Sequence, residues 1–150
     1  MTNQIKYRTD PKIDEKKVCT LLSENATWKV PTDPNRWRQI LDNSAAVISA
    51  WDGDNLVGFT RGLSDTVRFA QVLEVLVHPE YREQGIGREL VSRLLDQPVM
   101  AVRGVILGTP DKKAFYEKLG FKCLNEKAYL MVMVRDQFSQ GMILPINPSP

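Results

Sequence analysis

The sequence lacks the features that mark several large classes of protein. Only two of its 150 residues are cysteines, Cys19 and Cys123, and their wide separation fits no metal-ligating or redox spacing. A secretory signal pattern is also missing, so we expect a cytoplasmic protein with both thiols reduced. The longest apolar run is far shorter than the ~20 residues that cross a bilayer, so no membrane partner is predicted.

A strong charge of one sign is lacking too. The formal net charge is +2 and the basic residues are scattered along the chain, so neither a nucleic-acid partner nor a metal site is predicted. Internal repeats and low-complexity tracts are absent. The length therefore predicts one domain over residues 1–150, in which residues 136–150 form a tail that packs along the domain edge or stays loose.

The spacing of apolar residues predicts the order of the secondary-structure elements. Helix starts are indicated at Asp14 and at Asp33-Pro34, where a capping carboxylate precedes the apolar pattern. The strand at 69–77 is apolar except at Gln71 and Glu74, so we expect it to be central and covered on both faces. The order favours an α+β or α/β fold with a mixed sheet. The predicted strands are 5–8, 45–51, 56–61, 69–77, 105–108, 121–123 and 128–134, and the predicted helices begin after Asp14, at Pro34, at Ile86 and at Asp111, the last ending at Leu119.

Residues 69–95 carry the clearest signal for a binding site. An apolar strand leads through a charged turn to Gly85 and Gly87, which open an amphipathic helix. The N–H groups of a first helical turn lack partners and the helix dipole is positive there, while glycines place no Cβ between a ligand and the backbone. This pattern predicts a site for a phosphorylated ligand. By itself it does not choose between a nucleotide, a dinucleotide and coenzyme A.

Two motifs narrow this choice through a family resemblance. Arg82 to Gly87 (REQGIG) resembles the R/Q-x-x-G-x-G/A signature of the GNAT family of N-acetyltransferases, and Asp111 to Phe121 (DKKAFYEKLGF) resembles that family's second signature. The order of elements is also similar to that of the family. The resemblance implies an α+β, three-layer fold with a mixed, mostly antiparallel sheet flanked by helices. It also implies acetyl-CoA as co-substrate.

The resemblance further implies where the co-substrate binds. In the family the pyrophosphate rests on the turn before the third helix, which here means the backbone N–H groups of residues 84–88. Arg82 and Arg88 either add charge there or are solvated surface groups. The pantetheine arm pairs with the backbone at the end of the central strand, and Thr109 stands where many members carry a CoA-contacting asparagine. The implied contacts are Val75, Leu76, Val77, Arg82, Gln84, Gly85, Ile86, Gly87, Arg88, Thr109 and Tyr116.

The same resemblance implies a catalytic residue at Tyr116. Family members carry a tyrosine there near the thioester sulfur, and a phenol with the ordinary pKa of ~10 holds a proton that it can give to a leaving thiolate. We expect Phe115 in the core and Tyr116 beside it, towards the cleft. Glu74, the only charge in the central strand, is the candidate base, unless it pairs with an arginine or faces solvent. The position of His78 before Pro79 favours a turn role over a role as base.

The predicted reaction is direct transfer, in a ternary complex, to a primary amine of a small molecule. The alternatives are a protein or peptide lysine or N-terminal acetyltransferase and a non-catalytic acyl-CoA-binding module. Gly104 stands where one class of N-terminal acetyltransferases carries its base glutamate, which argues against that class. A homodimer is left open. The candidates for the acceptor pocket are Trp28, Trp37, Trp51, Phe59, Arg61 and Asp65, among which the tryptophans have a simpler interpretation as core residues.

Overall fold

A computed structural model describes residues 4–124 and 130–135 of the chain. Strands and helices follow each other in the order that the sequence predicts. Two short 3₁₀-helices, Pro79–Tyr81 and Pro98–Met100, add to that order. The elements are β1 (Lys6–Arg8), α1 (Glu15–Asn25), α2 (Pro34–Asp42), β2 (Ala46–Asp52), β3 (Asn55–Ser64), β4 (Phe69–Val77), α3 (Ile86–Leu95), β5 (Gly104–Gly108), α4 (Lys113–Glu117), β6 (Lys122–Cys123) and β7 (Leu130–Val134).

One mixed sheet connects all the strands of the described residues. Its order is β1-β2-β3-β4-β5-β7-β6. Every neighbouring pair is antiparallel except β4 and β5, which are parallel. The predicted mixed, mostly antiparallel sheet is therefore confirmed, with β4 at its centre. Of the final hairpin, β6 and β7 are confirmed, while residues 125–129 and the predicted tail 136–150 lie outside the described residues.

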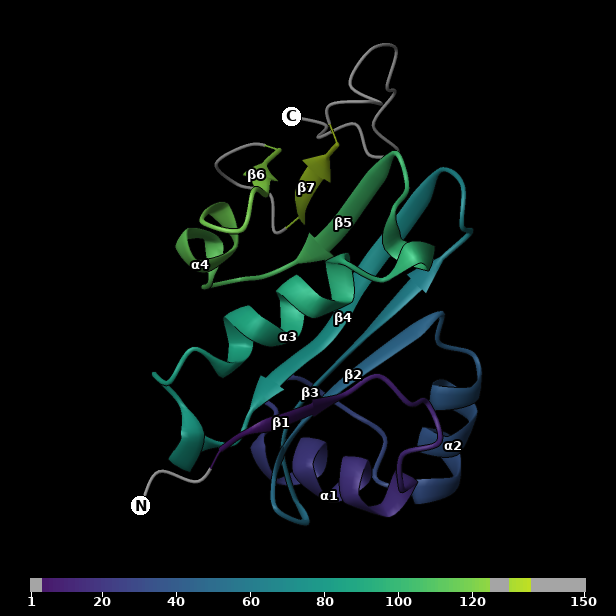
Figure 1. Cartoon of the computed structure of the whole chain (residues 1–150), viewed down its shortest axis with the longest axis vertical. Helices are drawn as coiled ribbons and strands as arrows, with labels where there is room; N and C mark the ends of the chain where they lie inside the picture. The colour runs from purple at the N-terminus through teal and green to yellow at the C-terminus, as the bar shows by residue number, and fades with distance from the viewer. Residues whose placement is uncertain (1–3, 125–129, 136–150) are drawn as a thin grey trace.

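The helices form a layer on each face of the sheet. Helix α3 packs on one face through buried residues such as Leu90 and Leu94, whereas α1 and α2 pack on the other face around Leu22 and Trp37. Figure 1 shows α1 and α2 together on one side of the sheet and α3 on the other side. Because each helix buries one apolar stripe against the sheet, two separate cores result, and the three-layer prediction is confirmed.

The predicted helix starts are also confirmed by their caps. The carboxylate of Asp14 accepts the backbone N–H of Lys16 at 2.9 Å, and that of Asp33 accepts the backbone N–H of Asn35 at 2.9 Å. Each cap satisfies one of the N–H groups that a first helical turn leaves unpaired. Asp33 is followed by Pro34 at the first helical position, where a missing N–H costs nothing.

Two expectations about the elements are wrong. Helix α4 is Lys113–Glu117 rather than 111–119, because the Thr109 hydroxyl accepts the Lys112 backbone N–H at 3.1 Å and holds the preceding residues in a turn. Strand β4 is not covered on both faces along its length. Ala70 is buried towards α3, but Phe69 and Gln71 line an open groove on the opposite face, since α1 and α2 pack on that face only around Leu76.

Candidate functional site

The parallel strands β4 and β5 pair over a short segment only. Their register joins Phe69–Gln71 to Gly104–Ile106 and ends there, although β4 continues to Val77. Beyond Gln71 this side of β4 pairs with no strand in the part of the chain that the structure describes. Figure 1 shows the two strands diverging after the paired segment. The predicted pantetheine positions, residues 75–77, all lie in the unpaired part, where backbone groups of β4 are available to a ligand.

A β-bulge interrupts β4 at the same level. The ladder with β3 runs from Phe59↔Leu76 to Arg61↔Leu73, so two residues of β4 face the single residue Thr60. Glu74 has a φ of 58°, a left-handed conformation that a side chain other than glycine rarely adopts. The Thr60 hydroxyl donates a hydrogen bond to the Leu73 carbonyl at 3.0 Å and holds the bulge in place. Bulges of this kind redirect side chains next to functional sites.

The turn that opens α3 presents a row of free backbone donors. Glu83 and Gly85 have φ values of 60° and 80°, which fold the chain tightly before the helix. Within the described residues, the N–H groups of 84–88 donate no hydrogen bond, and the first donor is Glu89, which bonds to the Gly85 carbonyl at 3.1 Å. The site predicted for phosphate at this helix start thus has free donors and the positive end of the dipole.

The side chains around this turn differ in their exposure to solvent. Gln84 and Arg88 are exposed, and Ile86 is buried in the α3 core. Arg82 is exposed as well, and its Nε donates a hydrogen bond to the Val77 carbonyl at 3.3 Å. That bond draws the Arg82 guanidinium towards the end of β4.

The two sequence motifs meet at Gly87. An ideal Cβ on this residue would lie 3.5 Å from Phe115 Cζ and 3.7 Å from Val77 Cγ2. Helix α4, which follows β5, therefore reaches across to the start of α3 and to the end of β4. Residues of the two signatures, about thirty positions apart in the sequence, form one local structure.

Tyr116 lies deeper than predicted. Its side chain is buried in the α3 core, with ring centroids 4.9 Å from Phe115 and 6.0 Å from Phe121, whereas Phe115 is half-buried. The expectation that Phe115 fills the core and Tyr116 lies beside it is wrong. Neighbouring residues of a helix point about 100° apart, so only one of the two aromatic side chains can face the core, and in α4 that residue is Tyr116. Burial, assisted by the charge of Asp111, raises the pKa of Tyr116 to about 12, so the phenol is protonated at neutral pH.

Two other predicted residues have local structural contacts. The hydroxyl of buried Thr109 accepts the Lys112 N–H, as described above. His78 precedes a 3₁₀-helix, and its Nδ1 accepts the backbone N–H of Glu80 at 3.2 Å. The turn role predicted for His78 is confirmed by this cap.

Glu74 faces the α1 and α2 side of the sheet. Its Oε2 accepts a hydrogen bond from Trp28 Nε1 at 3.4 Å, and Trp28 belongs to the loop between α1 and α2. Trp28 is 41% exposed, so it is not a core residue. Glu74 is half-buried, and its charge also acts on Arg61 of β3. The candidate base, a tryptophan and an arginine thus surround the bulge on this face.

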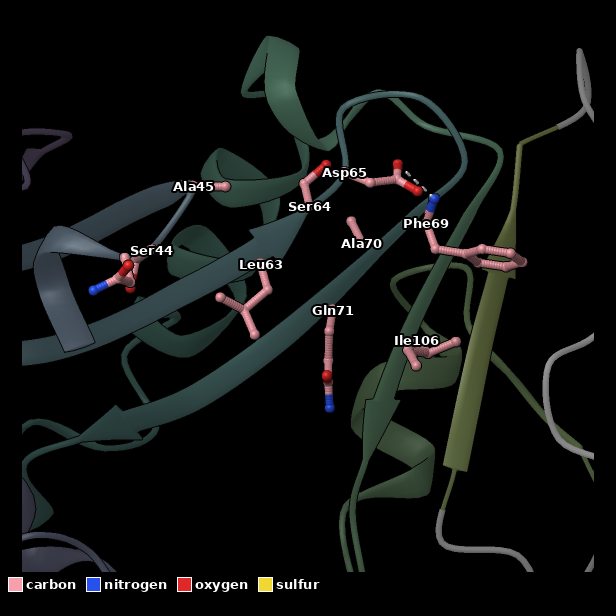
Figure 2. Close-up of a pocket in the computed structure, with 10 residues that line it drawn as sticks. Ser44, Ala45, Leu63, Ser64, Asp65, Phe69, Ala70, Gln71 and Ile106 are labelled. Carbon is pink, nitrogen blue, oxygen red and sulfur yellow. Dashed lines mark hydrogen bonds between the residues drawn. The ribbon is translucent and has the colours of Figure 1, made fainter. Parts of the chain in front are cut away.

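An open groove extends from this cluster along the same face. Its two halves share Asn43 and Leu63, and each encloses about 520–540 Å³. Figure 2 shows Leu63, Gln71 and Ile106 side by side, one from each of three adjacent strands. The half nearer α2 is lined by Pro31, Arg36, Gln39, Ile40, Asn43, Arg61 and Leu63.

Of the predicted pocket residues, only some reach this groove. Arg61 and Asp65 line it, while Trp37, Trp51 and Phe59 are buried in the α1 and α2 core. The Asp65 carboxylate accepts the backbone N–H groups of residues 67, 68 and 69, which lower its pKa and occupy it within a turn.

Most of the polar residues that line the groove were not identified from the sequence. Gln71 was visible as one of two polar residues in an apolar strand. Arg36 and Gln39 carried no signal, because polar residues on a helix usually face solvent.

Two further features are absent from the described residues, a metal-binding cluster and a membrane-spanning helix. No group of three or more His, Cys, Asp or Glu side chains in 4–124 and 130–135 is arranged to hold a metal ion. In the same ranges, none of the helices is both long enough and apolar enough to cross a membrane.

Comparisons with known proteins agree with this arrangement. A model of the acetyltransferase (GNAT) domain matches residues 43–123, more than half of the chain. The chain is 34% identical over 87 residues to ycf52 of Pyropia yezoensis, an uncharacterised N-acetyltransferase, and the match covers 54% of this chain and 50% of that protein. The chain spans about half the length of these curated relatives, including a ycf52-like protein of Prochlorococcus marinus.

Solved structures are similar over most of the chain. A candidate acetyltransferase of Deinococcus radiodurans is 29% identical with a TM-score of 0.69, over 83% of this chain and 90% of that one. The GNAT family N-acetyltransferase YhbS of Escherichia coli, in complex with CoA, is 18% identical with a TM-score of 0.72. That match covers 94% of this chain and 87% of YhbS.

Proposed function

The chain belongs to the GNAT family of N-acetyltransferases, and from this premise we propose that it transfers the acetyl group of acetyl-CoA to a primary amine of a small molecule. The amine attacks directly while both substrates are bound. The observation that carries the proposal is the unpaired length of β4 beside the free N–H groups of residues 84–88. Together they offer a backbone-lined channel that ends in an anion site.

The residues present fit acetyl-CoA. Five consecutive backbone N–H groups at a helix start suit a pyrophosphate, and the exposed Arg82 and Arg88 add positive charge beside them. The free backbone of residues 75–77 suits the amide groups of the pantetheine arm. When bound, acetyl-CoA supplies an acetyl thioester. Backbone N–H groups of β4 near the bulge are placed to polarise a carbonyl oxygen.

Tyr116 holds a proton for the leaving sulfur. The pKa of about 12 is well above the ~8.5 of an ordinary thiol, so complete proton transfer from this phenol to a thiolate is unfavourable. Tyr116 therefore stabilises the developing negative charge mainly as a hydrogen-bond donor. Phe115 and Phe121 fix the ring from two sides, which keeps the hydroxyl in one position.

Glu74 accepts the proton of the attacking amine. An ammonium group has no lone pair, so a base must act before or during attack. The bulge turns Glu74 out of the ladder at the point where β4 leaves β5, and the Trp28 indole N–H bonds to one of its carboxylate oxygens. The carboxylate thus lies on the same face as the groove, next to Leu73, which pairs with the groove residue Arg61. It takes the proton directly or through a water molecule.

The groove supports a small-molecule acceptor. Each half, at about 520–540 Å³, lies within the ~300–1,000 Å³ range of pockets that bind small ligands. A peptide substrate needs a longer channel to hold the residues on both sides of a lysine. Arg36 and Gln39 of α2 and Leu63 of β3 wall the half nearer α2 instead.

The proposal is tested by thiol release from acetyl-CoA. The purified chain is assayed with a panel of primary amines and with lysine-containing and free-N-terminal peptides, and the products are identified by mass spectrometry. We expect turnover with one class of small amines, and none in Gly87→Glu, which places a carboxylate in the anion site. Faster turnover of peptides would favour a protein acetyltransferase. Binding of acetyl-CoA without turnover of any amine would favour a non-catalytic module.

A further inference from the structure

The groove is lined by Arg61, which forms no ion pair within the described residues, and this feature bears on the acceptor. We infer that the acceptor amine also carries a carboxylate, and that Arg61 binds this group. The inference rests on the proposed function, because it assigns a substrate class to the same site. It makes Arg61 a specificity residue, which acts on the part of the acceptor that does not react.

The position of Arg61 follows from the alternation of β3. Phe59 points to the α1 and α2 face, where it is buried. Gly58 and Gly62 point to α3, since a Cβ on either would contact α3 residues. Arg61 and Leu63 therefore continue the row of Phe59, but they lie beyond the cover of α2 and line the groove. An apolar residue at 61 would complete this row, so the arginine needs another explanation than packing.

The Arg61 guanidinium is only partly satisfied. Its Nε is buried and has no hydrogen-bond partner, and its Nη1 reaches the Ser44 hydroxyl at a long 3.4 Å. Burial lowers the pKa of Arg61, and Glu74 opposes that effect from a distance. A buried N–H without an acceptor is costly, and the planar guanidinium matches a carboxylate with two parallel hydrogen bonds.

Around Arg61, the charge of Glu74 acts on the guanidinium without forming an ion pair with it. In the described residues, carboxylates form ion pairs with Arg38 and Arg93, but not with Arg61 or Arg36. Arg36, which lines the same half of the groove, is hydrogen-bonded to Gln39 at 3.3 Å. Ile40 and Leu63 add apolar walls. This lining suits a short apolar chain that ends in a carboxylate.

The charges of the face are also ordered in space. Glu74, at the bulge, attracts the amino end of an acceptor towards the proposed acetyl-CoA channel. Arg61 pairs in the β3–β4 ladder with Leu73, the residue before Glu74, and attracts the carboxylate end of the acceptor. An amino acid with a primary amine satisfies both groups at once, whereas a simple amine leaves Arg61 unpaired.

The test compares amino acids with their decarboxylated counterparts in the same thiol-release assay. L-Lysine is paired with 1,5-diaminopentane, and L-tryptophan with tryptamine, so that each pair differs only in the carboxylate. The variants are Arg61→Met, Arg61→Lys and the control Arg93→Met, which removes a guanidinium from α3 on the opposite face. Thermal melting checks that each variant is folded.

We expect the wild type to favour the carboxylated member of at least one pair by tenfold or more in kcat/KM. Arg61→Met should remove that preference through a KM at least tenfold higher for the carboxylated member, with the decarboxylated amine changed less than threefold. Arg61→Lys should restore part of the preference, and Arg93→Met should keep all of it. An equal loss for both members of each pair, or a wild type that prefers simple amines, would overturn the inference.

If the protein acetylates none of these amines, ligand binding still tests the inference about Arg61. The same ligand pairs are then titrated against the acetyl-CoA complex by calorimetry. Carboxylated ligands that bind, and bind tenfold more weakly to Arg61→Met, would support the anion site while refuting the proposed reaction. If no carboxylated ligand binds, or if Arg61→Met binds as well as the wild type, the inference is refuted. If Arg61→Met does not fold, Arg61→Gln replaces it with the same criteria.

Discussion

The two faces of the sheet form their parts of the site from different material. On the α3 face, the groups proposed to meet a ligand are mainly backbone N–H groups at the start of α3 and along β4, to which Arg82, Arg88 and Tyr116 add side chains. On the α1 and α2 face, they are the side chains of Glu74, Trp28 and Arg61. Backbone groups persist under most substitutions, whereas side chains change with one. The difference teaches that the first face can keep one ligand while the second adapts to different acceptors.

The largest effect on ligand binding is expected from a side chain added at the start of α3, where the proposed site consists mainly of backbone N–H groups. Gly87→Glu should lower the affinity for acetyl-CoA by at least a hundredfold, because a carboxylate then repels the phosphates from the free N–H groups. Isothermal titration calorimetry measures the loss. Thr20→Glu, which adds the same charge to an exposed position of α1, is the matched control and should bind normally. Normal binding by Gly87→Glu would mean that the phosphates bind elsewhere.

The next largest effect is expected on kcat, from a substitution of Glu74 on the α1 and α2 face. Glu74→Gln keeps the shape of the residue but removes the base, so kcat should fall by about a hundredfold or more. The Kd for acetyl-CoA should stay within threefold, because that ligand is held by the other face. Steady-state kinetics and calorimetry on the same preparation separate the two quantities. A normal kcat would remove Glu74 from the mechanism and leave it a role in shaping the bulge.

Tyr116→Phe should have an intermediate effect. Loss of a hydrogen bond to a developing thiolate should lower kcat by about tenfold to a hundredfold with little change in the KM for acetyl-CoA. The same variant tests the raised pKa. The folded-state pKa of about 12 exceeds the ~10 of an unfolded chain, so the neutral phenol stabilises the fold below pH 10, and this contribution is lost between pH 10 and 12.

Phenolate absorbance at 295 nm checks that pKa. The difference between the wild type and Tyr116→Phe should appear only above about pH 11, while the other tyrosines ionise in both proteins. A difference that appears near pH 10 would show that the ring is solvated and that Tyr116 is a stronger acid than we propose.

The smallest effect is expected at Asp65, which lines the groove but whose carboxylate accepts hydrogen bonds within a turn. Asp65→Asn should leave acetyl-CoA binding and kcat unchanged and lower the Tm slightly at pH 7. Its three backbone hydrogen bonds depress the pKa, so the contribution to stability is present above the ordinary pKa of 3.8 and is lost as the pH falls below it. The Tm difference between the two proteins should therefore shrink in acid. A lower kcat would place Asp65 in the acceptor site after all.

The α3 face was the more predictable one because its signals are local. The free first turn and the apolar stripe of α3 are encoded within residues 85–95, and the structure has them as predicted. The order of the elements along the chain and the caps at Asp14 and Asp33 depend on equally short patterns. Such features depend on hydrogen bonds between near neighbours, which a sequence displays directly.

The contacts on the α1 and α2 face could not be predicted from short sequence patterns. Whether Trp28 is buried, and whether Arg61 meets a carboxylate, depends on how far α2 extends over the sheet, and that is a long-range property. The exchange of Phe115 and Tyr116 has a similar origin, since the packing of α4 against Phe121 and the α3 core decides which of the two aromatic residues is buried. The bulge at Glu74 carried no sequence signal other than the glutamate itself.

That bulge makes β4 two short strands of opposite phase joined end to end. Before Glu74 the even-numbered residues Ala70 and Val72 point to α3, and after it the even-numbered Leu76 points to α1 and α2. Deleting one of the two bulged residues would restore regular alternation and leave Leu76 opposite Phe59 in the same core. The hydrophobic cores therefore do not require the extra residue, and what a deletion would remove is the left-handed position that Glu74 occupies.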